Sequence, residues 1–415
     1  MTPGFWEAAR YWLQLGLISF GGPAGQIALM QSELVDRRKW IGQREFLQAL
    51  NFCMLLPGPE AQQLATYIGW RMHGVWGGIV SGGLFVLPGA ILMMGLAWLA
   101  AAHGDAGLVG AVFDGVKPVV VAVVAFAVWR IGAKSFTHWA PVALAAFAFV
   151  SLRFLGLSFP IVVFGAGLVG WIAAKRGFDG FAAGGHGAPA SADPTGPSPS
   201  WGTVLKPLLA FVILWSVPVG LLLALAGTEP YLGVIKLFTI AAFVTFGGAY
   251  AVLPYIAEAA VAAQWLSPAE MVNGLALAES TPGPLILVNG YVGFFAGWAK
   301  GNLPAALLAG GTAVYLTFLP SFLFIFAGGP FLQRLSGNKL AQGALAAITA
   351  AVVGVILNLA VFFAVAVWQE TPADARWLSV ALCLFALAAQ VMKKLSTPWL
   401  VAIGAAVGGG RYLLG

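Results

Sequence analysis

The sequence predicts an all-α polytopic membrane protein built from two homologous repeats. Hydrophobic residues make up 60% of the 415 residues, charged residues only 9%, and the mean hydropathy is +0.89. This composition excludes a soluble globular protein, in which about 25% of residues are charged. Apolar stretches long enough to cross about 30 Å of hydrocarbon recur along the chain. Because none shows the alternating pattern of a membrane barrel, we expect the spans to be helical.

An internal repeat is the second observation behind this fold class. Three motifs recur in order, with separations of 226, 225 and 232 residues: FGG at Phe20 and Phe246 (246 − 20), PGP at Pro57 and Pro282 (282 − 57), and LP at Pro88 and Pro320 (320 − 88). Duplicated membrane halves with helix-breaking motifs at matching positions are typical of secondary transporters, whose substrate site lies at the repeat interface.

The hydrophobic segments define four regions of the chain. The first set covers residues 5–30, 44–73, 76–100, 107–130, 138–154 and 157–174, and the second covers 231–262, 269–299, 302–327, 343–369, 375–392 and 397–413. We predict an N-terminal transporter repeat over 1–174, a flexible Gly/Pro/Ala/Ser linker over 175–202, an extra transmembrane helix over 203–226 and a C-terminal repeat over 227–415.

The number of segments bears on how the halves are oriented. If every segment crosses once, seven crossings separate the repeats and the second half is inverted. The loop with Arg37 and Arg38 is basic, whereas its counterpart lies beside Glu258, which favours opposite faces. Arg130 and Lys134 are expected in a loop after the 107–130 helix. Strict alternation puts that loop and the Arg37 loop on opposite faces, so a re-entrant PGP segment and the absolute orientation stay open.

The PGP motif is expected to interrupt a helix inside the membrane. Pro57 lacks an amide N–H and disfavours helix at Leu56, so a first half-helix should end there. Gly58 permits a tight turn, and Pro59 suits the first position of a new half-helix. The second half-helix would direct free N–H groups and a positive dipole end into the protein, an arrangement that binds anions.

The FGG motif predicts a second break in each half. Gly21 and Gly22 interrupt the first helix and Pro23 restarts it, whereas Gly247 and Gly248 are followed by alanine, which makes that break less sharply defined. Up to four half-helix ends would then converge at mid-membrane. The alternative is that these residues only kink or pack helices, and the repetition of both motifs in register favours the functional interpretation.

Two acids are predicted to couple transport to protons. Glu60 follows the first PGP break, where a carboxylate can simply complement a helix N-terminus. A second negative charge about 4 Å away costs about 4 kcal/mol at an effective dielectric of 20, so Glu60 and an oxyanion would compete unless the carboxyl is protonated. Glu279, shortly before Pro282, is the second candidate, because a buried acid in a span is a functional candidate by default. Leu285 occupies the Glu60 position in the second half.

Other polar residues near the breaks are candidates to bind substrate or to tie helices together. The neutral ones are Gln62, Gln63, Thr66, Thr281 and Asn289. Lys117, close to Asp114, is the candidate cation, whereas Arg71 is expected to extend to the membrane interface.

We predict neither a metal site, a cofactor nor a nucleic-acid partner. The basic residues are scattered between spans, which is typical of loops at a membrane surface. The histidines have no metal-ligand spacing and the cysteines lie in apolar runs: His73, His103, His138, His186, Cys53 and Cys383.

At FGGP, DRRKWIG, LPGPEAQQLATYIGW and TPGP, the chain resembles the chromate transporter family of prokaryotic inner-membrane proteins. The resemblance covers both halves. It implies two fused homologous halves in opposite orientations that export chromate from the cytoplasm using the proton motive force, with shorter relatives that supply each half as a separate chain. The site residues it implies are Gly21, Gly22, Pro57, Gly58, Pro59, Glu60, Gln62, Gly247, Gly248, Pro282, Gly283 and Pro284.

The predicted function is therefore secondary transport of an oxyanion, not catalysis, by a multi-pass protein of the prokaryotic inner membrane. Its partners would be the oxyanion, protons and membrane lipid, and a homodimer is left open. Sulfate has the same charge and tetrahedral shape as chromate, so a carrier of sulfate or another oxyanion is the alternative. An intramembrane enzyme acting on phospholipid or polyprenyl phosphate would need clustered catalytic groups. A passive channel fits paired breaks and intramembrane acids less well.

Overall fold

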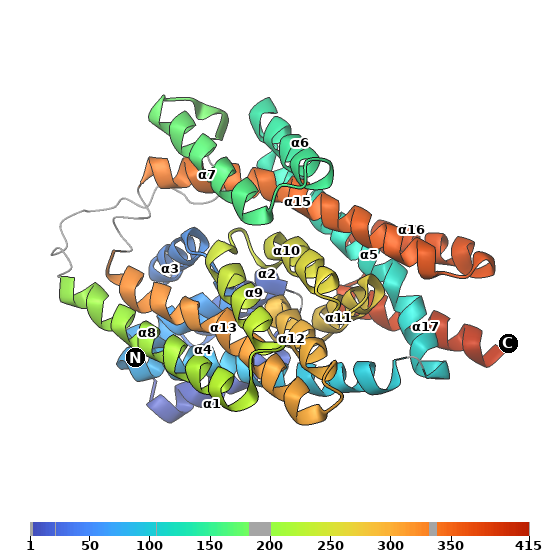
Figure 1. Cartoon of the computed structure of the whole chain (residues 1–415). Helices are drawn as coiled ribbons and strands as arrows, with labels where there is room; N and C mark the ends of the chain where they lie inside the picture. Colours follow the sequence, from blue (N-terminus) through green and yellow to red (C-terminus); the bar gives the residue numbers. More distant parts are fainter. Residues whose placement is uncertain (1–2, 21, 105, 182–200, 332–337, 415) are drawn as a thin grey trace.

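The described residues fold into helices that are joined mostly by short turns. The computed structural model describes residues 3–20, 22–104, 106–181, 201–331 and 338–414. Those residues contain no β-strand (Figure 1), which confirms the predicted all-α class. Six of the described helices are long and apolar enough to cross a membrane. The protein is thus a multi-pass membrane protein.

The same order of helices occurs twice. The first half contains α1 (Phe5–Ile18), α2 (Gly22–Gln31), the π-helical turn η1 (Ser32–Arg37), α3 (Gln43–Leu55), α4 (Glu60–His103), α5 (Gly107–Ser135), α6 (Trp139–Arg153), α7 (Phe159–Lys175) and the turn η2 (Asp179–Phe181). After α8 (Trp201–Ala226), the second half contains α9 (Tyr231–Val244), α10 (Ala249–Ala262), α11 (Pro268–Ser280), η3 (Leu285–Leu287), α12 (Val288–Trp298), α13 (Leu303–Gly328), η4 (Gly329–Phe331), α15 (Lys339–Glu370), η5 (Ala373–Ala375), α16 (Arg376–Val391) and α17 (Thr397–Leu414).

Each half begins with helices that are too short to cross a membrane alone. α1, α9 and α10 have 14 residues each, and α3 and α11 have 13. At a rise of 1.5 Å per residue, 14 residues span about 21 Å, less than the roughly 30 Å of hydrocarbon. The predicted segments 5–30, 44–73, 231–262 and 269–299 are therefore each divided in two, and the predicted breaks at FGG and PGP are confirmed.

α4 comprises two helical arms that turn back against each other at His73 and Gly74. The Ser81 hydroxyl of the second arm donates to the Ala65 carbonyl oxygen of the first arm at 2.8 Å. His73 and Gly74 leave helical geometry, Gly74 with a φ of +64°. This turn separates a short arm after the PGP motif from a long arm. In the second half, α12 and α13 correspond to these two arms and are separated by a loop. The predicted segments that end at residue 73 and begin at residue 76 meet at this turn.

The two halves are interlocked through their long helices. α5 packs against α16 and α17 of the second half, whereas α15 packs against α6 and α7 of the first half (Figure 1). Glycines allow both contacts, since a Cβ on Gly115 would lie 2.1 Å from the Gly404 carbonyl oxygen and a Cβ on Gly170 would lie 2.3 Å from that of Gly343. Each half thus supplies the outer helices that cover the other.

One predicted boundary is wrong. α5 continues to Ser135 instead of ending at residue 130, so Arg130 and Lys134 lie within a helix and not in a loop. Both side chains are exposed, so the helix continues past them without burying a charge.

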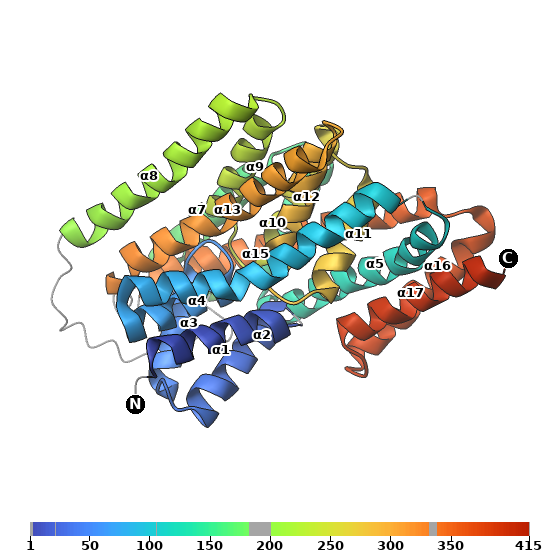
Figure 2. The same cartoon turned by 90° about the horizontal axis from the view of Figure 1, so that it is seen from below.

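The connection between the halves is described only in part. Residues 182–200 of the predicted linker lie outside the described residues. α8 lies at the edge of the molecule, where it packs against α9 and α13 (Figure 2). The domain boundaries and the inversion of the second half stay predictions.

Candidate oxyanion site where the helix breaks meet

The helix breaks of the two halves are joined by backbone hydrogen bonds. The Gly58 N–H donates to the carbonyl oxygen of Thr245 at 2.7 Å, and the Gly283 N–H donates to that of Ser19 at 3.0 Å. Ser19 and Thr245 directly precede the FGG motifs, so each PGP glycine bonds to the FGG break of the other half. The donors are 283 − 58 = 225 residues apart and the acceptors 245 − 19 = 226, the spacings of the motifs themselves. Such reciprocity is typical of a twofold relation.

The third repeated motif also meets the PGP turn of the other half. A Cβ on Gly89, which follows the LP motif of α4, would lie 2.4 Å from the carbonyl oxygen of Pro282. In the matching contact, a Cβ on Gly58 would lie 2.8 Å from Oγ of Ser321. The PGP glycines have φ values of +120° and +102°, which favour glycine. All three motifs that the sequence repeats therefore converge.

One side chain reinforces this junction in the first half only. Gln26 is fully buried and its Nε2 donates to the carbonyl oxygens of Gly283 at 2.7 Å and Ser19 at 3.3 Å. The matching position, 26 + 226 = 252, is Val252 in the second half. The two halves therefore share a backbone arrangement but differ in the side chains around it.

The FGG breaks are built from glycines in conformations that other residues rarely adopt. Gly22, Gly247 and Gly248 have φ values of +72°, +80° and +91°, whereas Gly21 lies outside the described residues. α2 begins at Gly22 and α10 at Ala249. Each start leaves first-turn N–H groups without intrahelical partners, at the positive end of the helix dipole.

A cavity of about 60 Å³ lies between the two halves at the start of α2. It is large enough for a few water molecules or one small ion. Its lining comes from α2 (Gly22, Pro23, Ala24), α5 (Val123, Phe126, Ala127, Arg130), α10 (Tyr250), α11 (Glu279), α16 (Gln390) and α17 (Thr397). The α2 start, the first turn of α10 and the end of α11 thus bring three of the four breaks to one cavity.

The cavity holds one positive and one negative side chain. Arg130 is exposed at its rim and makes no hydrogen bond or ion pair within the part of the chain that the structure describes. Glu279 is buried and accepts a hydrogen bond from the Tyr250 hydroxyl, which is buried as well. A guanidinium and a hydrogen-bonded carboxylate therefore face the same small space from opposite halves of the protein.

The cavity also contains a buried amide without partners. Gln390 is 6% exposed, and neither its Nε2 nor its Oε1 has a hydrogen-bond partner among the described residues. A buried polar group left unpaired costs about 1 to 3 kcal/mol, and most such groups in proteins are satisfied. The Gln390 amide is therefore available for hydrogen bonds within the cavity.

The predicted residues around the first PGP motif form a buried polar cluster beside the break. Gln62 Nε2 donates to Thr66 Oγ1 at 3.0 Å, and Gln63 Nε2 donates to the Pro57 carbonyl oxygen at 2.7 Å. Oε1 of both glutamines lacks a partner among the described residues. Glu60 begins α4, is half-buried and makes no described hydrogen bond or ion pair, but it does not line the cavity.

In the second half, the predicted polar residues are also buried near the break. Thr281 precedes the PGP turn that runs through Pro282 and Pro284, and it is 7% exposed. Asn289 Nδ2 donates to Thr317 Oγ1 at 3.0 Å. This hydrogen bond links α12 to α13. Neither Thr281 nor Asn289 lines the cavity.

Lys117 is placed away from the breaks. Its Nζ bonds to Asp114 at 2.9 Å and to Glu370 at 3.1 Å. It lies 130 − 117 = 13 residues before Arg130 on α5, about 20 Å along the helix axis. Its charge is thus paired with two carboxylates, away from the cavity.

Sequence reasoning missed three residues of the cavity. Arg130 resembled an interfacial charge because it ends an apolar run, yet it shares one helical face with Val123 and Ala127, a spacing that could have been noticed. A lone polar residue in an apolar run was the available signal for Gln390. Nothing in the sequence pairs Tyr250 with Glu279.

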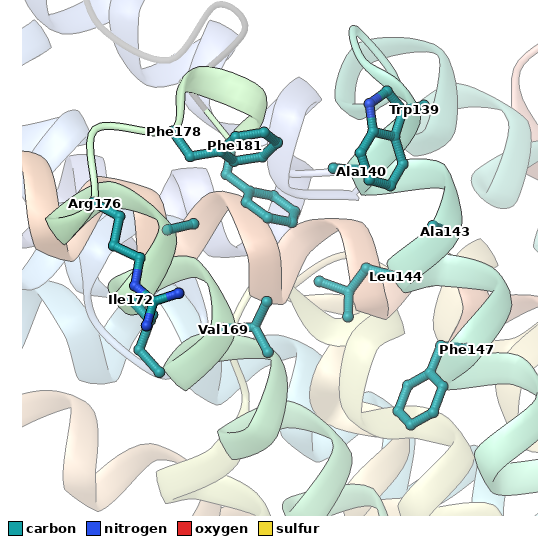
Figure 3. Close-up of a pocket in the computed structure, with 11 residues that line it drawn as sticks. Trp139, Ala140, Ala143, Leu144, Phe147, Val169, Ile172, Arg176, Phe178 and Phe181 are labelled. Carbon is teal, nitrogen blue, oxygen red and sulfur yellow. The ribbon is translucent and has the colours of Figure 1, made fainter.

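A larger groove lies between α6 and α7, with a volume of about 590 Å³. Figure 3 shows Trp139, Phe147, Phe178 and Phe181 around it, with Arg176 as the charged residue of its lining. The groove touches no helix break, and its walls are mainly apolar. It lacks the combination of charges, amide and helix end found at the smaller cavity. Among the described residues, no cluster of three potential metal ligands occurs.

Comparison with known proteins identifies the family. The chromate transporter family matches residues 6–171 and 232–409. A chromate transport protein of Pseudomonas aeruginosa is 31% identical over 385 residues, which cover 91% of this chain and 84% of that protein. One from Cupriavidus metallidurans is 27% identical over 412 residues, 97% of this chain and 92% of that protein.

A shorter relative corresponds to part of the chain. An uncharacterized transporter of Bacillus subtilis is 29% identical over 145 residues, which cover 35% of this chain and 73% of that protein. No solved structure matches. Because the family match falls in both halves and the relatives are named transporters, this chain belongs to the chromate transporter family, and its function is transport and not catalysis.

Proposed function

We propose that this protein is a secondary active transporter that exports chromate from the cytoplasm across the prokaryotic inner membrane, driven by the proton motive force. The observation that carries the proposal is the convergence of the helix breaks of both halves, joined through Gly58–Thr245 and Gly283–Ser19 beside a shared cavity. Discontinuous helices that meet at a repeat interface are where secondary transporters bind their substrates. Chromate is the named cargo of the relatives from Pseudomonas aeruginosa and Cupriavidus metallidurans.

The half-helix ends suit a tetrahedral dianion. The starts of α2, α4 and α10 direct unpaired N–H groups and positive dipole ends toward the junction, and such ends bind anions without a full positive charge. The residues proposed to shape or contact the substrate are Gly21, Gly22, Pro57, Gly58, Pro59, Glu60, Gln62, Gln63, Gly247, Gly248, Thr281, Pro282, Gly283, Pro284 and Asn289, and Lys117 would contribute charge at a distance.

The reciprocal hydrogen bonds support alternating access between the halves. Each PGP turn is held by the FGG break of the opposite half. A rocking movement of one half against the other would therefore change both junctions together, which is the behaviour expected of a carrier and not of an open pore.

Protons are proposed to be coupled to the substrate at two acids near the helix breaks. Glu279 lines the cavity, and Glu60 begins the half-helix after the first PGP motif. A dianion about 5 Å from an ionised carboxylate is repelled by about 7 kcal/mol at an effective dielectric of 20. Protonation of the acid removes that repulsion, so binding of the substrate and of the proton would be linked.

Sulfate or another tetrahedral oxyanion is the second candidate substrate. Backbone N–H groups and helix dipoles respond to charge and shape, in which sulfate and chromate agree. Competition between unlabelled sulfate and labelled chromate in vesicles of defined sidedness separates the two substrates.

The decisive experiment measures labelled chromate uptake into everted membrane vesicles, with and without an uncoupler. We expect wild-type vesicles to accumulate chromate, the uncoupler to abolish accumulation, and Pro57→Ala and Glu60→Gln to reduce it. Flux that is insensitive to the uncoupler would remove energy coupling from the proposal, and absence of chromate flux would remove the substrate.

A further inference from the structure

The small cavity between the halves combines features that point to where the anion and the proton bind. Of its lining residues, Arg130 is the cation and Glu279 is the acid, and they come from α5 of one half and α11 of the other. Neither residue forms an ion pair with the other within 4.0 Å, and no described hydrogen bond engages Arg130. The cavity therefore presents an available guanidinium opposite a carboxylate that already has a partner.

We propose that the transported oxyanion binds between Arg130, Gln390 and the first turn of α2, and that Glu279 takes up a proton as the anion binds. This inference rests on the oxyanion transport proposed above and assigns its binding residues. Arg130 and Gln390 are distinct from the residues of the FGG and PGP motifs.

Arg130 supplies the charge. A guanidinium presents N–H donors in a planar fork that matches two oxygens of an oxyanion, and such charge-assisted pairs are strong. α5 holds Arg130 at the rim of the cavity, because Val123 and Ala127 on the same helical face are buried against the protein. The side chain can thus meet an anion that enters from the exposed rim.

Gln390 is the independent sign of a ligand. Its side chain is buried in the cavity lining, and its amide nitrogen has no acceptor among the described residues. Oxygen atoms of a bound anion could accept hydrogen bonds from the N–H groups of that amide. The 10-residue helix α2 adds first-turn N–H groups after Pro23, which itself has none.

Glu279 and Tyr250 supply the proton switch. Among the described groups, those that act on the Glu279 carboxyl are Tyr250 from α10 and Arg130 from α5. The Tyr250 hydroxyl has one proton, so it can donate to Glu279 or to an anion but not to both. When Glu279 is protonated, it no longer repels the anion. The Tyr250 hydroxyl is then free to donate its hydrogen bond to the anion instead of to the carboxylate. Both changes favour a bound anion, so each ligand increases the affinity for the other.

This arrangement determines how much charge moves with the substrate. With the cavity empty, the charges of Arg130 and ionised Glu279 cancel. With a dianion bound and Glu279 protonated, the site carries one net negative charge. A membrane potential that is negative inside favours outward movement of that loaded site, so the electrical part of the proton motive force would drive export.

The test measures anion binding by the purified full-length protein in nanodiscs, using isothermal titration calorimetry with chromate and, separately, sulfate. Titrations in two buffers with different ionisation enthalpies give the number of protons taken up per anion. We expect proton uptake with the wild type, and affinity that falls as pH rises. Glu279→Gln should bind the anion without proton uptake and with little pH dependence.

The donors are tested with matched substitutions. Arg130→Gln should weaken anion binding at least tenfold, Arg130→Lys should weaken it less, and Gln390→Leu should weaken it several-fold. Lys134→Gln is the control, since Lys134 is an exposed cation one turn further along α5 that does not line the cavity. Gel filtration and circular dichroism of each variant establish that it is folded.

Two results would overturn the assignment. One is wild-type affinity in folded Arg130→Gln, and the other is anion binding by the wild type without proton uptake. If either occurs while wild-type vesicles still accumulate chromate, the transport function stands and only this site is wrong. If wild-type protein neither binds nor transports either oxyanion, the proposed function fails together with the site.

Discussion

Gly89 of α4 lies directly against Pro282 of the second half, so that a Cβ on Gly89 would be 2.4 Å from the Pro282 carbonyl oxygen. This contact explains a repeated sequence feature, because Gly89 follows the LP motif and Pro282 begins the second PGP motif. A backbone atom cannot rotate away as a side chain can. The position therefore tests whether the convergence of motifs matters for transport.

We expect Gly89→Ala to displace the second PGP turn, to destabilise the protein by about 1 to 3 kcal/mol, and to reduce chromate uptake into vesicles. The matched control is Gly95→Ala in the same helix, where a Cβ would meet nothing within 4 Å. Alanine raises helix propensity there by up to about 1 kcal/mol relative to glycine. Equal uptake by the two variants would contradict the importance of this contact.

Gln26 provides a test of the junction itself. Its Nε2 donates to carbonyl oxygens of Gly283 and Ser19. Gln26→Met keeps the length of the side chain but removes the donor, so we expect a loss of about 1 to 3 kcal/mol in the free energy of unfolding. Gln31→Met, which removes only an exposed 3.4 Å contact with Gln43, is the control. Thermal unfolding of both variants in detergent measures the difference, and an equal shift in Tm would refute it.

Gly248 separates backbone strain from steric overlap. It caps α10 with φ +91° and ψ 177°, a conformation that is essentially restricted to glycine, although a Cβ there would meet nothing within 4 Å. We expect Gly248→Ala to cost about 1 to 3 kcal/mol through strain alone. Gly220→Ala, in the middle of α8 and also without neighbours within 4 Å, should not destabilise. Comparable unfolding temperatures would show that the FGG break tolerates a side chain.

The interlocked packing of the halves depends on small residues. A Cβ on Gly408 of α17 would lie 2.0 Å from the Ala111 carbonyl oxygen of α5, whereas one on Gly410 would meet nothing within 4 Å. Gly408→Leu should therefore separate the two helices and reduce the yield of monodisperse protein, while Gly410→Leu should not. Gel filtration after detergent extraction measures this, and identical profiles would show that α5 and α17 can pack differently.

A charged turn after α2 predicts a small acid dependence of stability. Hydrogen bonds from Arg37 and Arg38 lower the pKa of Glu33 below its ordinary value. A lowered folded pKa stabilises the protein above the ordinary carboxyl pKa, and that contribution is lost as pH falls through the lowered value. Glu33→Gln should therefore lower the free energy of unfolding by less than about 1 kcal/mol at neutral pH. At strongly acidic pH it should leave that free energy unchanged. Unfolding of both proteins measured from neutral to strongly acidic pH tests this pH dependence. A variant that is less stable than the wild type only in acid would contradict it.

The sequence by itself determined where the helices break. Proline lacks an N–H and glycine tolerates positive φ, so PGP and FGG act on the backbone locally and their effect does not depend on distant partners. The repeat spacing also determined that both halves have the same plan. A charged residue after an apolar run can either begin a loop or continue the helix. The end of α5 at Ser135, beyond Arg130, could therefore not be predicted from composition.

Only the tertiary structure decided which break meets which. The hydrogen bonds of Gly58 with Thr245 and of Gly283 with Ser19 join residues that are far apart in the chain, and no local pattern specifies such a pairing. The cavity likewise depends on Arg130 and Gln390, which lie far apart in sequence and come together because α5 packs against the outer helices of the other half. The residues of each motif determine the local backbone conformation. The distance between side chains that are remote in sequence is determined only when the helices pack together.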